Sequence, residues 1–136
     1  MTRLTIPFLV PMLNGPNGLQ RAHWAKIRLL RKKIYTALLT SHLDEYAIFP
    51  RSISPAKVTI TRFSNRQPDD DNLVAGAKLI LDEMKERYEV ATRGRTKINL
   101  AHGWIVDDSP DLCSLTCRWE KAKRGQGKVV VEVEQG

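Results

Sequence analysis

Residues 56–88 read AKVTITRFSNRQPDDDNLVAGAKLILDEMKERY, and this stretch decides how the chain is organised. Residues 56–63 alternate between two faces, which is the pattern of a half-buried β-strand. The polar residues 64–68, which end in a proline, indicate a loop. From residue 72 to about 88 the apolar positions recur at spacings of three and four, which predicts a helix with one buried face. This apolar stripe consists of Leu73, Ala77, Ile80, Leu81, Met84 and Tyr88.

Outward from this unit, the sequence predicts three more strands and one more helix. The strands are expected at residues 2–10, 112–120 and 128–134, and the helix at residues 21–41. The helix follows from the spacing of Trp24, Ile27, Leu30, Ile34 and Leu38. The last two strands are joined by the basic turn 121–127 and should form an antiparallel hairpin. Residues 89–103 have no clear period and indicate a long basic loop.

These elements predict one domain over residues 1–136 of the α/β (α+β) class, with a small mixed sheet, a C-terminal antiparallel hairpin and two main helices. The composition is 42% hydrophobic and 27% charged, which is ordinary for a globular core. Cys113 and Cys117 have no further ligand set beside them, so we expect reduced thiols and a cytoplasmic protein. No apolar segment is long enough to span a bilayer, and no membrane partner is expected.

The net charge of the chain is +7, and its sequence pI is about 9.7. A net positive charge of this size favours polyanionic partners such as DNA or RNA. A soluble basic protein without such a partner can carry the same charge.

Two acidic clusters stand out against this basic background: Asp69-Asp70-Asp71-Asn72, before the second helix, and Asp107-Asp108, after Trp104. Helix capping explains one or two aspartates of the first cluster, and a turn explains the second. Three adjacent aspartates exceed what capping requires, and their mutual repulsion would be relieved by a cation such as Mg²⁺.

Helix geometry places Asp71, Lys78 and Asp82 on one face of the second helix. An ordinary i, i+4 pair between Lys78 and Asp82 explains this spacing. A lysine beside a metal-binding carboxylate, where it stabilises a phosphate, explains it as well.

The phrase DDDNL, a lysine and an aspartate on the same helix, and the phrase GWIVDDS together resemble RusA-type Holliday junction resolvases, many of them phage- or prophage-encoded. The resemblance implies a homodimer that cuts four-way junctions by paired nicks and depends on Mg²⁺, with Mn²⁺ as a substitute. It implies metal binding by Asp69, Asp71 and Asp108, with Asp107 as a further ligand, and a catalytic role for Lys78. Lys78 lies about one helical turn, or about 5 Å, further along the helix than the lysine of the best-known member.

Under the same resemblance, basic residues on the first helix and in the long loop would contact the DNA backbone. The residues expected to do so are Arg21, Arg28, Lys32, Arg93, Arg95 and Lys97. A less selective nuclease with the same site, and a non-catalytic nucleic-acid-binding module, remain alternatives. We expect His42 and His102 to be exposed to solvent or in loops, and Trp104 to lie in the core.

Overall fold

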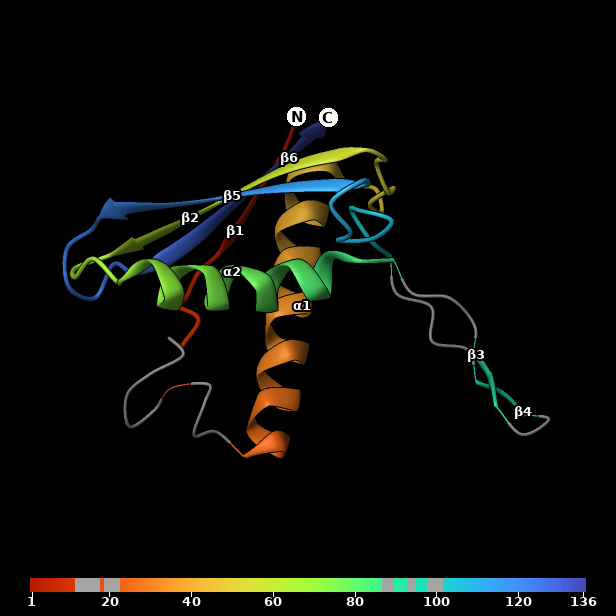
Figure 1. Ribbon diagram of the computed structural model, residues 1–136, viewed down its shortest axis with the longest axis horizontal. Helices are drawn as coiled ribbons and strands as arrows, with labels where there is room; N and C mark the ends of the chain where they lie inside the picture. Colours follow the sequence, from red (N-terminus) through yellow and green to blue (C-terminus); the bar gives the residue numbers. More distant parts are fainter. Residues whose placement is uncertain (12–17, 19–22, 87–89, 93–94, 98–101) are drawn as a thin grey trace.

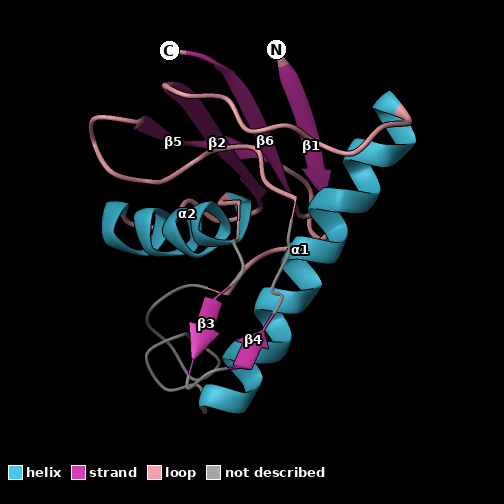
Figure 2. Cartoon of the chain, turned by 90° about the vertical axis from the view of Figure 1, so that its right-hand side faces the viewer, coloured by secondary structure: helices cyan, strands magenta, loops and turns pink. Residues whose placement is uncertain are grey.

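The structure is a computed structural model that describes residues 1–11, 18, 23–86, 90–92, 95–97 and 102–136. Its main sheet contains β1 (Thr2–Ile6), β2 (Ala56–Ser64), β5 (Cys113–Lys121) and β6 (Lys128–Gln135). Two helices, α1 (Trp24–Tyr46) and α2 (Asp70–Met84), lie on one face of this sheet (Figure 2). The expected α+β class, with a mixed sheet and two main helices, is therefore confirmed.

The predicted C-terminal hairpin is wrong, because β2 lies between β5 and β6. The strand order is β1-β6-β2-β5 (Figure 2), and β2 pairs antiparallel with β6 and parallel with β5. The valines of β6 agree with its central place: Val129, Val131 and Val133 form the row that packs into the core, and Val130 on the opposite face is also buried. The connection of residues 122–127 is also longer than the two to five residues that usually close a hairpin.

Residues 89–103, predicted as a long loop, contain a second, two-stranded sheet. β3 (Val90–Thr92) pairs antiparallel with β4 (Arg95–Lys97). Figure 1 shows this pair away from the main sheet, beyond the C-terminal end of α2. These strands have only three residues each, which is too short for an alternating pattern to be recognised in the sequence.

The core fills the space between the sheet and the two helices. β1, β2 and β6 contribute their inward rows, and α2 contributes Ala77, Ile80 and Met84. In α1 only the second half supplies buried residues, namely Ile34, Leu38 and His42. Trp24, expected in the buried stripe, is instead 67% exposed, because the first turns of α1 extend past the sheet (Figure 1).

Trp104 anchors the segment that follows the second sheet. Its backbone N–H donates to the carbonyl of Met84 at 2.9 Å, and its indole Nε1 donates to Nδ1 of His42 at 3.0 Å. Trp104 is 2% exposed, which confirms its predicted place in the core. His42 is buried beside it, so the expectation of an exposed His42 is wrong. The sequence placed His42 beyond the end of its helix, whereas α1 continues to Tyr46.

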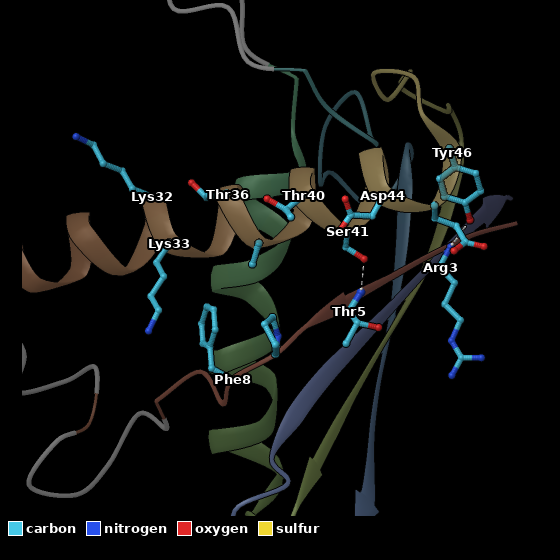
Figure 3. Close-up of a pocket in the computed structure, with 13 residues that line it drawn as sticks. Arg3, Thr5, Phe8, Lys32, Lys33, Thr36, Thr40, Ser41, Asp44 and Tyr46 are labelled. Atoms are coloured by element: carbon cyan, nitrogen blue, oxygen red, sulfur yellow. Dashed lines mark hydrogen bonds between the residues drawn. The ribbon is translucent and has the colours of Figure 1, made fainter.

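The free edge of β1 is covered by α1. The backbone N–H of Arg3 donates to Oη of Tyr46 at 3.1 Å, and that of Thr5 donates to Oγ of Ser41 at 2.9 Å (Figure 3). These bonds satisfy backbone N–H groups of β1 that an exposed sheet edge would otherwise offer to another strand. Among the described residues, no helix has the length and apolar character that crossing a bilayer requires.

Candidate active site

The loop between β2 and α2 is fixed by hydrogen bonds to the side chain of Ser64. Ser64 is buried at the end of β2; its Oγ accepts from Nε1 of Trp119 at 2.9 Å and donates to the carbonyl of Arg66 at 2.8 Å. Ser64 thus ties the start of the loop both to β5 and to the carbonyl of Arg66 within the loop. The chain therefore enters α2 in a defined direction. The tryptophan on β5 therefore helps to position the first aspartate of the acidic cluster.

Asp69 is the N-cap of α2; the sequence leaves this role open between Asp69 and Asp70. Its Oδ1 accepts from the backbone N–H of Asn72 at 3.0 Å, and its backbone is extended, with φ −68° and ψ 166°. Capping thus orients the carboxylate and leaves Oδ2 outside this bond. Asp70 and Asp71 follow in the first turn and are exposed, where the positive end of the helix dipole favours negative charge.

Asp69 and Asn72 line a groove of about 530 Å³ at this end of the sheet. Arg62, Arg66 and Arg124 line the same groove. Carboxylate and amide oxygens suit a hard divalent cation, and guanidinium groups suit phosphate oxygens. This groove therefore combines the two kinds of group that recognise a metal-bound phosphodiester.

None of the three arginines that line this groove was expected from the sequence to belong to the site; they are Arg62, Arg66 and Arg124. A detectable signal for Arg62 was the inward row of β2, where an arginine follows Val58 and Ile60 at alternate positions. Burial lowers the pKa of the Arg62 guanidinium from its ordinary value.

The second acidic cluster lies at the other end of α2. Nζ of Lys85 is 3.5 Å from Oδ1 of Asp108 and 3.4 Å from Oδ1 of Asp82. Partial burial opposes ionisation of Asp108, but Lys85 and hydrogen bonds from Asp107 and the backbone outweigh it and lower the pKa of this carboxyl. Burial of Lys85 is likewise outweighed by Asp108 and Asp82, which raise the pKa of its ammonium group. Asp108 is thus neutralised by a lysine that sequence reasoning did not single out.

The two acidic clusters are not brought together within one chain. Asp71 and Asp82 are eleven positions apart on α2, which corresponds to about 16 Å along the helix axis. Burial raises the pKa of the Cys113 thiol at the start of β5, and the charges of Asp108 and Asp107 raise it further. The second cluster therefore lies near the start of β5. The described residues contain no group of three His, Cys, Asp or Glu side chains that could hold a metal ion.

Lys78 lies between these clusters, along the outer side of α2. Burial raises the pKa of the Cys117 thiol on β5, and the charge of Lys78 opposes this rise only in part. The pair of Lys78 with Asp82, one of the two explanations for their spacing, is not among the ion pairs of the described residues: Asp82 pairs with Arg31 at 3.5 Å and with Lys85. Asp71, Lys78 and Asp82 share one face of α2, but Asp82 forms its ion pairs with residues outside this set.

The other basic residues expected to contact DNA are distributed over the chain. Arg28 and Lys32 are exposed on α1, and Arg95 and Lys97 are the first and last residues of β4. Arg21 and Arg93 lie outside the described residues. Lys32 lines a separate groove of about 980 Å³ between β1 and α1, far along the chain from both acidic clusters (Figure 3).

No protein-family model and no curated protein matches the chain.

Proposed function

We propose that this chain is a Mg²⁺-dependent DNA endonuclease that resolves four-way junctions by paired nicks as a homodimer. The observation that carries the proposal is the groove in which Asp69 and Asn72 lie beside Arg62, Arg66 and Arg124. Metal-binding oxygens next to phosphate-binding cations are the components that phosphodiester hydrolysis uses. The net charge of +7 favours DNA as the substrate, and the resemblance to RusA-type resolvases suggests the four-way junction.

The donor set at the start of α2 suits Mg²⁺, which binds proteins through one or two carboxylates and keeps several water molecules. Asp69 and Asp71 would hold it, and Mn²⁺ has the same preference for oxygen ligands. When bound, the metal ion supplies a water of lowered pKa and polarises the phosphate. The bond from Asn72 to Asp69 fixes the carboxylate, and the arginines hold and orient the phosphate group. Lys78, about 10 Å further along α2 than Asp71, contacts the flanking DNA backbone.

Asp108 joins this site from a second copy of the chain. In one chain it lies at the far end of α2, beside Lys85. A twofold dimer in which the two α2 helices run antiparallel would place Asp108 of one copy near Asp69 and Asp71 of the other. Such a dimer contains two equivalent sites, as paired nicks require.

The proposal is tested by cleavage of a labelled synthetic four-way junction, with and without Mg²⁺. Asp69→Asn keeps a good N-cap and removes only the charge, so we expect a folded protein with activity reduced about 100-fold or more, or about 2.7 kcal/mol. Asp70→Asn is the matched control, because Asp70 is exposed in the same cluster but belongs neither to the groove lining nor to the proposed metal ligands. Asp70→Asn should retain activity within about tenfold, or about 1.4 kcal/mol.

A non-catalytic nucleic-acid-binding module is the second candidate. It is favoured by the capping role of Asp69 and by the neutralisation of Asp108 by Lys85, since both explain the acids without a metal ion. Junction binding without cleavage, with Mg²⁺ and with Mn²⁺, would establish this alternative. Equal cleavage of plain duplex DNA would keep the nuclease and remove its junction selectivity.

A further inference from the structure

Arg62 occupies a position that a core residue would otherwise fill. It follows Val58 and Ile60 on the row of β2 that faces the helices, and Val58 and Ile60 are fully or almost fully buried. Arg62 itself is partly buried and lines both the groove at Asp69 and a small cavity beneath it, next to Val10 and Ile80. Placing a cation there costs free energy unless its charge and its hydrogen-bond donors are matched.

The described residues match Arg62 only in part. Its Nη1 donates to the carbonyl of Val10 at 2.6 Å, while its Nε is buried without an acceptor among the described residues. The ion pairs formed by the described residues do not include Arg62. Burial alone lowers the pKa of its guanidinium, which agrees with the lack of a neighbouring carboxylate that would stabilise the charge. The guanidinium group, which lines the groove, therefore carries a positive charge that no described ion pair matches.

Two further arginines converge on the same groove from different loops. Arg66 is exposed in the loop after β2, where Ser64 holds its carbonyl, and Arg124 is exposed in the connection between β5 and β6. Three guanidinium groups against the single carboxylate of Asp69 give this groove an excess of positive charge. Planar guanidinium groups bind phosphate oxygens in a bidentate manner.

We propose that Arg62, Arg66 and Arg124 form a phosphate-binding site for a backbone phosphate of DNA that neighbours the phosphate to be cut. This inference rests on the proposed function for its choice of DNA, but the site itself requires neither metal nor cleavage. Arg62 binds from the base of the groove, and Arg66 and Arg124 close over the phosphate from its two sides. The site positions the strand relative to Asp69.

The first experiment measures thermal unfolding of the metal-free chain with inorganic phosphate, against chloride at equal ionic strength. Phosphate should raise the Tm of the wild type by about 2–4 °C by binding the folded state. Arg62→Met should abolish this rise. Arg118→Met is the control, because Arg118 is an exposed arginine on β5 whose neighbours Cys117 and Trp119 face the helices. Arg118→Met should respond to phosphate as the wild type does.

Arg62→Met also separates binding from structure, since without phosphate its Tm should equal or exceed that of the wild type. If Arg62→Met does not fold, Arg124→Met replaces it, because Arg124 is exposed and its removal leaves the core intact. The phosphate-induced rise should then fall by at least half. An equal rise in all variants would overturn the proposal and assign the effect to general surface charge.

The second experiment measures metal-free binding of a four-way junction at several salt concentrations. Loss of one phosphate contact should lower the slope of log K against log salt by about one. If the variants lose the phosphate response but keep the junction affinity and slope, the groove binds a small phosphate compound and the assignment to DNA fails. A chain that binds phosphate and DNA as described but never cuts would refute the nuclease and leave this site standing.

Discussion

His42 shows how one side chain links the long helix to the segment that ends in Asp108. Its Nδ1 accepts from the indole of Trp104, so its proton must lie on Nε2 and the ring must be neutral. Its ring also packs 4.8 Å from that of Tyr46, centroid to centroid. A protonated ring would lose the acceptor and leave a buried cation beside Trp104.

Mild acid should therefore destabilise the protein through His42. Burial lowers the pKa of folded His42 below its ordinary 6.5, so the unfolded chain binds the proton more tightly. The stabilising contribution is present above that ordinary pKa and is lost as the pH falls below it. We expect a loss of about 1 kcal/mol in the free energy of unfolding between pH 7 and pH 5, measured by urea titration.

His42→Asn provides the control, because its side-chain oxygen can replace Nδ1 as the acceptor and does not titrate. The part of the pH dependence that comes from His42 should disappear in this variant. The same decline in His42→Asn and in the wild type would show that other groups cause it.

For single residues, the sequence predicts those features that depend on residues nearby in the chain. Capping of α2 by an aspartate of the first cluster and burial of Trp104 follow from residue type and local pattern, and both are confirmed. The bond between His42 and Trp104 joins residues 62 positions apart, and the pair formed by Lys85 with Asp108 joins residues 23 apart. No local pattern encodes such distances, so both partners were missed.

Among the elements, α1 ends with an unusual residue. Ala47 follows the helix with φ 59°, in the left-handed region, and its N–H donates to the carbonyl of Leu43 at 2.9 Å. Helices commonly end on glycine at such a position, because a β-carbon is strained there.

Ala47→Gly should consequently stabilise the protein. Relief of strain outweighs the greater freedom of glycine in the unfolded chain, so we expect a gain of about 0.5–1 kcal/mol in the free energy of unfolding. Calorimetric or denaturant unfolding measures it, and Ala25→Gly, within the first turn of α1, is the comparison that should lose stability. A loss of stability in Ala47→Gly would contradict the strain.

Element positions were predictable because strands and helices have different periods, whereas strand pairing was not. The sequence places β2, β5 and β6 within a residue or two of their observed ends. It does not place β2 between β5 and β6, because neighbours in the chain are the default partners. The run Val129–Val131 was the available signal, since three adjacent valines, all of them buried, are more typical of a central strand than of an exposed edge.

For the whole molecule, the proposed nuclease requires carboxylates at opposite ends of α2 to meet in one site. The resemblance to the RusA family implies that Asp69, Asp71 and Asp108 form one set, because they occur in the order of that family. Order along the chain does not determine whether the third member comes from the same copy, and the separation along α2 favours a second copy.

Mixing two inactive variants distinguishes these arrangements. Asp71→Asn and Asp108→Asn should each cut a four-way junction at least about 100-fold more slowly than the wild type, or about 2.7 kcal/mol. If the site is shared between copies, their heterodimer contains one intact site and one doubly altered site. Co-refolded mixtures should then recover about a quarter of wild-type nicking, because half of the dimers are mixed and each has one active site. Recovery should not occur if each site belongs to one copy.

The central place of β6 also has a consequence for synthesis of the chain on the ribosome. β1 and β2 are made early, but neither can pair with its main-sheet neighbour β6 until residues 128–135 have been translated. Until then β1 and β2 present unpaired edges, which other nascent chains can bind. The sheet is therefore completed late, and protection of these edges by chaperones would matter most while β6 is still missing.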